Sequence, residues 1–412
     1  MSLDLTRTAD GFSFTWAQWS LLCSLSRFKD SSQGTHAELT IYSTAKDPPR
    51  LLTQGMMNLS ALQTRDRLVS RLAKLLPDLP WDTVIETVCV RGMAVYREGE
   101  PWELLTPQTE DRPARFLLNP LLYHGHPTLF YGPGDSGKSF LALYLACLAA
   151  SGGEALGLSV KPDGHRVLYC NWEMRADEMR LRTKLLVAAH PSLVRFPFHR
   201  FCYQPLTEFA PDLRREIQAQ QIEVIVIDSL ALASGGEIER SEAAIRFFAA
   251  LTSLDCTSLV IGHVAKGVEE HNRTPYGSVF FFNLARSVWE VRKTQEENDG
   301  LFKIALFHRK NNLGRKLPPM GYSVTVSESE AAVSQFNPSD EPEFSSGIAL
   351  HLRIALLLKD GEARTVQQIA EDIDAPEETV RKTLNRYKGK KWYCVTHGGG
   401  RGKEAEWARL DI

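Results

Sequence analysis

Apolar and polar positions alternate in two different rhythms between residues 128 and 326. Short runs of aliphatic, β-branched or aromatic residues are separated by stretches whose apolar residues follow the helical period. The runs that predict strands cover residues 128–131, 166–171, 224–228, 258–262, 287–291 and 302–307. Because strands interleaved with helices form βαβ units, the pattern predicts an α/β domain built on a mainly parallel sheet.

The first 105 residues follow a different pattern. Short β-like runs come first, and residues 65–79 then show the spacing of an amphipathic helix. The apolar face of that helix holds Leu68, Leu72, Leu75 and Leu76. We expect a small α+β region at residues 1–105, and no group of residues in it indicates a role. Residues 106–127 have the composition of a connector, so the α/β domain is predicted to span residues 106–326.

The pattern changes again after residue 326. Residues 327–346 hold five acidic and no basic residues, together with Pro and Ser, which is typical of a flexible linker. Three helices and a β-hairpin are then predicted at residues 349–359, 365–370, 377–387 and 392–410. Thr365 is a suitable N-cap for the second helix. This order predicts a winged helix-turn-helix domain at residues 347–412.

The formal net charge of −2 excludes a uniformly basic DNA-coating protein, but it conceals one basic segment. Residues 379–403 hold eight Lys or Arg and no Asp or Glu. A helix with such a face can enter the major groove while its cations neutralise phosphates. The candidate DNA contacts are Arg381, Lys382, Arg386, Lys390, Arg401 and Lys403. The alternative is a protein-binding winged helix.

The strongest motif lies between a predicted strand and a predicted helix. Residues 132–139 read GPGDSGKS and fit G-x-x-x-x-G-K-[ST] at every fixed position. Glycines let backbone N–H groups surround phosphate oxygens, and the helix N-terminus adds positive charge there. Lys138 is expected to reach the β- and γ-phosphates, and Ser139 to ligate Mg²⁺. The candidate nucleotide-binding residues are Gly132, Pro133, Gly134, Asp135, Ser136, Gly137, Lys138, Ser139 and Phe140.

Three further polar residues follow the ends of predicted strands. Asp228 ends residues 224–228, and a carboxylate there is suited to hold Mg²⁺ or its water. No Glu follows Asp228 directly, so Glu173, after the strand at 166–171, is the candidate general base. The alternative for Glu173 is a helix N-terminal carboxylate stabilised by the helix dipole. His263, after the strand at 258–262, is a candidate γ-phosphate sensor, or else a structural histidine.

Together, the segments GPGDSGKS, NWE, VIVIDS and VIGHVAK resemble the core of RecA-type ATPases over about residues 115–326. The resemblance is strongest to the RepA-like branch of plasmid and phage hexameric helicases. It implies one ATP site formed by Lys138, Ser139, Glu173, Asp228 and His263. It also implies a homo-hexamer that hydrolyses ATP at subunit interfaces with Mg²⁺ bound.

The same resemblance implies residues that act across a subunit interface or on DNA. Arg286 and Lys310 are the candidates for a cation donated to the neighbour's ATP, although Asn312 stands where the family usually has Arg. The alternative is that both residues are solvated surface charges. Residues 264–278 correspond to the loop that reaches DNA in the central channel of such motors. Lys266 and Arg273 are the candidate phosphate contacts, unless this is an ordinary surface loop.

Composition excludes several other classes of protein. The seven cysteines form no C-x-x-C pair, which argues against a zinc site and against a disulfide framework. No apolar run approaches the ~20 residues of a membrane span. The first residues lack the pattern of a signal peptide, so we expect a cytoplasmic protein.

Three functions are therefore considered. The first is a ring-forming, ATP-hydrolysing DNA helicase of plasmid, phage or mobile-element replication. The second is an ATP-controlled DNA-binding regulator or loader that does not unwind duplexes. The third, a structural module with a degenerate site, is disfavoured because Lys138, Ser139, Glu173 and Asp228 are all present.

Replacement of the loop lysine tests the whole assignment. Lys138→Ala removes the cation that the motif directs at the phosphates, so steady-state ATP turnover should fall at least about a hundredfold. Turnover is measured by phosphate release. Unchanged turnover would show that the site is assigned wrongly.

Overall fold

The computed structural model describes residues 3–8, 11–99, 102, 104–105, 115–264, 274–295, 300–395 and 405–410. The chain divides into two compact units. The first holds Met1–Pro113, Phe209–Gln221 and Ser253–Asp255, and the second holds the remaining residues.

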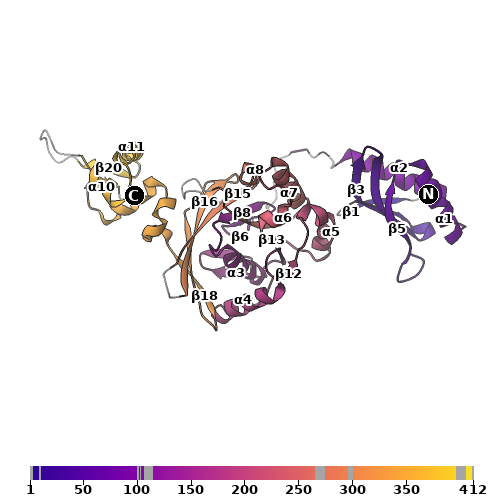
Figure 1. Ribbon diagram of the computed structural model, residues 1–412, viewed down its shortest axis with the longest axis horizontal. Helices are drawn as coiled ribbons and strands as arrows, with labels where there is room; N and C mark the ends of the chain where they lie inside the picture. Colours follow the sequence, from indigo (N-terminus) through magenta and orange to yellow (C-terminus); the bar gives the residue numbers. More distant parts are fainter. Residues whose placement is uncertain are drawn as a thin grey trace. The chain divides into compact units, whose positions relative to one another are not determined.

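Five antiparallel strands form the sheet of the first unit, in chain order (Figure 1). They are β1 (Asp4–Thr8), β2 (Gly11–Trp16), β3 (Leu21–Ser31), β4 (Gly34–Ser43) and β5 (Arg50–Asn58). Alternate residues of β2 are buried, so Phe12, Phe14 and Trp16 contribute to the core. Helices α1 (Leu62–Leu75) and α2 (Trp81–Glu98) follow, and buried residues of both helices join the same core.

The predicted leucine face of α1 is wrong at one position. Leu72 is fully buried, and Leu68 and Leu76 pack against the core, but Leu75 is 40% exposed. Val69 packs there instead. The buried stripe is centred near Leu72, and Leu75 lies at its rim in the last turn of the helix.

The second unit is built on a nine-stranded sheet in the order β12-β11-β13-β14-β8-β15-β16-β17-β18. The pairs from β12 to β15 are parallel, and those from β15 to β18 are antiparallel. The strands are β8 (Pro127–Gly132), β11 (Val167–Asn171), β12 (Phe198–Phe201), β13 (Val224–Asp228), β14 (Thr257–His263), β15 (Ser287–Gln295), β16 (Leu301–Asn311), β17 (Met320–Val326) and β18 (Ala331–Phe336). All six strands expected from the sequence are present, and the α/β class with a mainly parallel sheet is confirmed.

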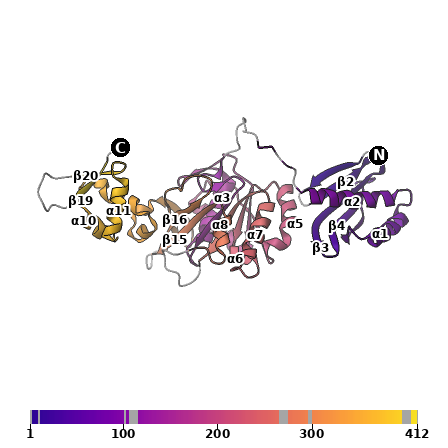
Figure 2. The same ribbon diagram turned by 90° about the horizontal axis from the view of Figure 1, so that it is seen from above.

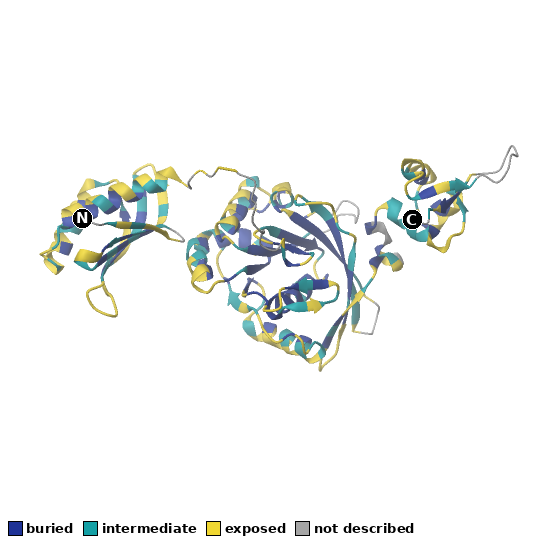
Figure 3. Cartoon of the chain, turned by 180° about the vertical axis from the view of Figure 1, so that it is seen from behind, coloured by how far each residue is buried: buried dark blue, intermediate teal, exposed yellow. Residues whose placement is uncertain are grey.

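Helices connect the successive strands of this sheet (Figures 1 and 2), and residues 209–219, in one of these helices, belong to the first unit. The helices are α3 (Lys138–Ser151), α4 (Ala176–Ala189), α5 (Leu206–Ala219), α6 (Leu230–Ser234), α7 (Ser241–Ser253) and α8 (Val279–Leu284). Short strands β6 (Phe116–Leu118), β7 (Leu122–Tyr123), β9 (Gly153–Ala155) and β10 (Leu158–Val160) form two small hairpins. Almost all of α3 is buried, and strands β11 and β13 are buried on both faces (Figure 3). That burial explains why these strands read as continuous apolar runs.

The predicted linker at residues 327–346 is wrong over most of its length. Strand β18 pairs with β17 along the edge of the sheet, and the Phe344 side chain is buried against Phe307. Two short 3-10 helices, Pro338–Asp340 and Pro342–Gly347, follow β18. Ala331 and Val333 are buried, while Ala332 between them is half-buried and Ser334 and Gln335 are exposed. The average composition of residues 327–346 does not reveal a strand, in which successive side chains point to opposite faces.

Three helices and a three-stranded sheet follow. They are α9 (Leu350–Leu357), α10 (Val366–Asp372), α11 (Glu377–Tyr387), β19 (Arg364–Thr365), β20 (Trp392–Val395) and β21 (Glu406–Arg409), with sheet order β19-β21-β20. Thr365 caps α10 through a capping box with Gln368. Trp392 and Trp407 contribute to the core between the helices and the sheet. The predicted tip of the hairpin falls on residues 396–404, outside the described residues.

No helix among the described residues is long and apolar enough to cross a membrane. The seven cysteines are all free. Among the same described parts of the chain, no group of three or more His, Cys, Asp or Glu is arranged to hold a metal ion by itself.

A matched pair of substitutions distinguishes a strand from a linker at β18. Val333→Asp buries an unpaired carboxylate at a position that is 4% exposed, so the free energy of unfolding should fall by about 3 kcal/mol. Ser334→Asp, at the exposed neighbouring position, should change it by about 0.5 kcal/mol. Chemical denaturation measures both. Equal effects would contradict the strand.

Candidate active site

The phosphate loop lies between the carboxyl end of β8 and the first residue of α3. Gly137 has a φ of 75°, and a Cβ added there would lie 2.7 Å from Cδ1 of Ile304 on β16. A Cβ on Gly132 would lie 2.3 Å from the Val291 carbonyl oxygen on β15. Both positions therefore require glycine, because the loop packs directly against the antiparallel part of the sheet.

Lys138 is buried inside this loop. Its ammonium group donates hydrogen bonds to the carbonyl oxygens of Gly132 and Pro133, at 3.1 and 2.5 Å, and to Oγ of Ser136, at 3.0 Å. Burial lowers the pKa of Lys138 to about 8, although the nearby carboxylate of Asp228 acts in the opposite direction. A bound phosphate would stabilise the charged form, because it brings negative charge to a site with little water.

Asp228 occupies the carboxyl end of β13, beside the loop. Its Oδ2 accepts a hydrogen bond from the Tyr169 hydroxyl at 2.8 Å. Burial raises the pKa of Asp228, while hydrogen bonds from Tyr169 and Ser139 lower it. The Ser139 hydroxyl and this carboxylate are thus neighbours and form a hard oxygen pair. They fit Mg²⁺, which takes one or two protein oxygens and completes its shell with phosphate and water.

Glu173 lies just after β11, where the Asn171 side chain accepts hydrogen bonds from the backbone N–H groups of residues 173 and 174. Its Oε1 accepts a hydrogen bond from the Ser229 hydroxyl at 2.6 Å. The same oxygen is 3.9 Å from Nε2 of His263, the last residue of β14. The His263 imidazole, the Ser229 hydroxyl and Lys138 lower the pKa of Glu173 against the effect of partial burial. The carboxylate is therefore ionised at neutral pH.

Lys138, Ser139, Glu173 and His263 line one cavity of about 480 Å³. Asp228 is buried beside Ser139 and does not line it. The cavity brings together the loop, the carboxyl ends of β11 and β14, and the antiparallel strands β15, β16 and β17. Its lining residues are Asp135, Ser136, Gly137, Lys138, Ser139, Phe140, Glu173, Met174, Arg182, Leu185, His263, Lys293, Phe302 and Val326. The volume lies within the usual range of ~300–1,000 Å³ for ligand pockets. Most of the predicted nucleotide-site residues thus meet at one edge of the sheet.

Sequence reasoning missed Lys293 and Phe302 in this cavity. The Lys293 ammonium lies 3.3 Å from Oδ2 of Asp135 and 4.8 Å from the centre of the Phe302 ring. Phe140 contacts Phe302 edge to face, with ring centres 6.3 Å apart. The two rings offer an apolar surface to a base, and Lys293 offers a second cation to phosphate. No sequence signal marks these positions, because only the pairing of β15 with β8 and β16 brings them to the loop.

Arg286 and Lys310 lie at the opposite edge of the sheet. Arg286 is exposed. Its backbone N–H donates a hydrogen bond to the carbonyl oxygen of Pro127 at the start of β8, five residues before Gly132. At ~3.3 Å per residue the two ends of β8 are roughly 16 Å apart. Lys310 donates to three carbonyl oxygens at the end of α8, those of residues 282, 283 and 285, at 3.0, 2.6 and 2.8 Å. Neither residue reaches the cavity of its own chain.

The candidate DNA contacts on α11 are exposed. Arg381 and Lys382 form ion pairs with Glu377 and Glu378 at 3.8 and 2.7 Å, one turn earlier on the helix. Arg386 lies over the Tyr387 ring, and Lys390 is exposed just after the helix. The remaining candidates lie outside the described residues, and they are Lys266, Arg273, Arg401 and Lys403.

Residues 100–269, less than half of the chain, match the model of a family described as an AAA domain. No curated protein matches the chain. Two solved structures are similar in part, each with 16% sequence identity. The KaiC-like protein of Pyrococcus horikoshii covers 53% of this chain and 93% of its own, with a TM-score of 0.37. The match to the flagellar accessory protein FlaH of Methanocaldococcus jannaschii covers 51% of this chain and 90% of FlaH, with a TM-score of 0.35.

The family match covers the phosphate loop, and together with the arrangement of the cavity it supports a P-loop ATPase domain at the centre of the chain. Such a family suggests ATP hydrolysis and, usually, Mg²⁺ binding. In this site, Ser139 and Asp228 are the residues suited to the metal.

The Lys293 ammonium supplies a test of the cavity. Lys293→Ala should weaken binding of a fluorescent ATP analogue about tenfold, because a charge-assisted hydrogen bond to phosphate is lost. Asp135→Asn should strengthen binding of the analogue, because it removes the carboxylate that pairs with Lys293. Lys316→Ala, an exposed lysine beyond β16, is the control. Wild-type affinity of the Lys293 variant would exclude Lys293 from the nucleotide site.

Proposed function

We propose that the chain is a ring-forming, RepA-like ATPase of the RecA superfamily that works on DNA, with helicase activity as its role in replication. The observation that carries the ATPase part is the convergence of Lys138, Ser139 and Glu173 on one cavity at the carboxyl edge of a parallel sheet. Asp228 is buried next to Ser139, just behind that lining. Ligands of open α/β sheets bind at this edge.

Each residue has a distinct part in the proposed hydrolysis. Lys138 exchanges its bonds to loop carbonyls for bonds to the β- and γ-phosphate oxygens. Ser139 and Asp228 would hold Mg²⁺, which would supply positive charge against the phosphates. The carboxylate of Glu173 accepts a hydrogen bond from the attacking water and orients it. Since its pKa is lowered, Glu173 acts mainly as a positioning acceptor rather than as a strong base.

His263 provides a physical link between hydrolysis and DNA. It contacts Glu173 on one side and ends the strand that leads into residues 265–273, which lie outside the described residues. Movement of the Glu173 carboxylate with phosphate release therefore acts on the start of the loop proposed to contact DNA through Lys266 and Arg273.

The position of Arg286 and Lys310 supports the proposed ring. Both lie at the edge of the sheet opposite the nucleotide cavity, so a subunit cannot use them on its own ATP. In a head-to-tail ring, the edge of the sheet that carries Arg286 in one subunit faces the nucleotide cavity of the next subunit. Exposed Arg286 is then the better donor, because Lys310 already holds the last carbonyls of α8.

The C-terminal segment supports binding of duplex DNA. Arg381, Lys382 and Arg386 are exposed on α11, and the ion pairs of Arg381 and Lys382 with Glu377 and Glu378 are on the surface. Exposed pairs contribute little stability, so phosphates can replace those glutamates at low cost. This placement also favours the second candidate, a regulator or loader that binds duplex DNA under ATP control without unwinding it.

Glu173→Gln separates binding from chemistry. The variant keeps the hydrogen-bonding shape but loses the charge that orients water, so kcat should fall about 10²–10⁴-fold while ATP still binds. Phosphate release and analogue binding measure the two quantities. Glu178→Gln, an exposed glutamate in the first turn of α4, is the control. A fully active Glu173 variant would remove Glu173 from the mechanism.

A forked DNA substrate then decides between the two functions. ATP-dependent strand displacement that is lost in the Glu173→Gln variant supports the helicase. DNA binding with ATP turnover but no strand displacement excludes the helicase and leaves the regulator or loader.

A further inference from the structure

A second basic segment lies outside every motif recognised in the sequence. Residues 179–207 hold five Lys or Arg and no Asp or Glu. The segment runs from α4 through the edge strand β12 to the start of α5. Its aromatic residues Phe196, Phe198, Phe201 and Tyr203 are interleaved with its last two cations. Cations interleaved with aromatic rings are typical of surfaces that bind single-stranded nucleic acid.

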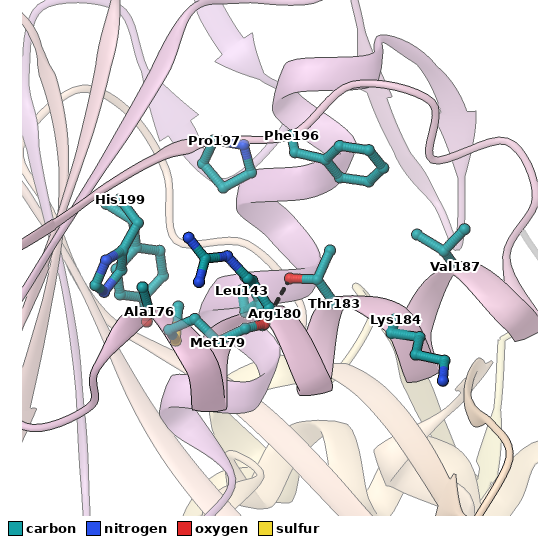
Figure 4. Close-up of a pocket in the computed structure, with 11 residues that line it drawn as sticks. Leu143, Ala176, Met179, Arg180, Thr183, Lys184, Val187, Phe196, Pro197 and His199 are labelled. Atoms are coloured by element: carbon teal, nitrogen blue, oxygen red, sulfur yellow. Dashed lines mark hydrogen bonds between the residues drawn. The ribbon is translucent and has the colours of Figure 1, made fainter.

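Part of this segment lines a second cavity, of about 590 Å³, that shares no residue with the nucleotide cavity. Helix α4 contributes Arg182 and Leu185 to the nucleotide cavity, and Arg180 and Thr183 to the second cavity. The two cavities therefore lie against different faces of one helix. Phe196 lies across the second cavity from α4 (Figure 4). Most of the lining is apolar, with Leu143, Met179, Val187, Phe196 and Pro197.

Two exposed rings lie along this side of the edge strand. The Phe196 side chain is 50% exposed, and that of Tyr203 is 79% exposed. Half-buried Phe201 holds the second ring, since it contacts Tyr203 edge to face with ring centres 4.9 Å apart. Phe201 is two residues from His199, which lines the cavity, so both face the same side of the sheet. Within the described residues, β12 ends the sheet, and no further strand covers these rings.

Three cations accompany the two rings. Arg180 and Lys184 lie one turn apart on α4, and both are exposed where they line the cavity. Arg175 precedes α4, and its guanidinium lies 5.4 Å from the centre of the Phe201 ring. Asp177 pairs with Arg180 at 2.8 Å, but both side chains are largely exposed, so the pair is weak. A phosphate can therefore replace Asp177 at low cost.

We propose that the α4–β12 surface, made up of these two exposed rings and three cations, binds single-stranded DNA. One base enters the cavity against Phe196, another stacks on Tyr203, and the cations bind the phosphates. Every base has a face that stacks on an aromatic ring, so the surface is tolerant of sequence. The choice of DNA rests on the proposed function, whereas the site itself is separate from α11 and from residues 264–278.

The exposed rings favour single-stranded DNA over the other occupants that cations attract. Paired bases present only their edges in the grooves of a duplex, so a duplex cannot stack on these rings. An acidic peptide anchored in the cavity by one apolar side chain would leave Tyr203 in water. A strand whose bases are unpaired uses the cavity, Tyr203 and the cations together.

Removal of both rings tests the stacking. The double variant Phe196→Ala, Tyr203→Ala should bind fluorescent oligothymidylate at least tenfold more weakly than the wild type, because two stacked bases lose their partners. Leu181→Ala is the matched control, since it truncates a side chain of α4 that is 59% exposed and lines neither cavity. Fluorescence anisotropy of the full chain measures binding, and thermal unfolding checks that each variant is folded.

Removal of two cations tests the phosphate contacts independently. In the double variant Arg180→Gln, Lys184→Gln, the slope of log K against log salt concentration should become less steep by about 1.4, since each phosphate contact on a single strand contributes about 0.7. The matched control is Arg71→Gln, Lys74→Gln, which removes two exposed cations from α1. An unchanged slope in the α4 variant would contradict the phosphate contacts.

Photo-cross-linking locates the bound strand. An oligonucleotide that carries 5-iodouracil should cross-link to Phe196 or Tyr203. Wild-type affinity of the aromatic variant, or cross-links only to other parts of the chain, overturns the proposal. An acidic peptide of alternating Glu and Phe that displaces the strand better than unlabelled oligothymidylate does would also overturn it, in favour of a protein partner. None of these measurements uses ATP, so failure of this surface and failure of the ATPase are separate results.

Discussion

The hydrogen-bonded register of four parallel strands sets the spacing of the groups in the nucleotide cavity. Asn171 on β11 pairs with Asp228 on β13, and His263 on β14 pairs with Gly132 on β8. A slip of one residue in any of these ladders would turn a strand-end side chain to the other face. The position of Glu173, which follows Asn171, depends on the same ladder. Backbone pairing therefore places the candidate catalytic groups, and their side-chain hydrogen bonds only refine that placement.

Burial gives these groups their electrostatic character. Lys138 and Asp228 are both withdrawn from water, which lowers the pKa of the lysine and raises that of the aspartate. A charge in such a site interacts strongly with any other charge that enters, because the effective dielectric constant is low. The antiparallel strands complete the enclosure, since Phe302 and Ile304 of β16 pack against the glycine at residue 137. The phosphate loop is thus part of an enclosed, largely buried site and is not an isolated surface turn.

The places where sequence and structure disagree have a common cause. The six strands and the phosphate loop were predictable because each has a local pattern. The linker prediction failed because the five acidic residues on the two sides of β18 outweighed Ala331 and Val333 in the average composition of the segment. Lys293 was missed because its neighbours in the cavity come from other strands, and no spacing along the chain reports that.

By itself, the sequence determined the α/β class, the phosphate loop and the strand-end positions of Glu173, Asp228 and His263, since each depends on residues within one short segment. The tertiary structure alone decided that Lys293 and Phe302 join the cavity and that Arg286 lies at the opposite edge of the sheet. Those facts depend on which strands pair and in which direction. Pairing is set by the packing of the whole sheet against its helices, and local patterns do not encode it.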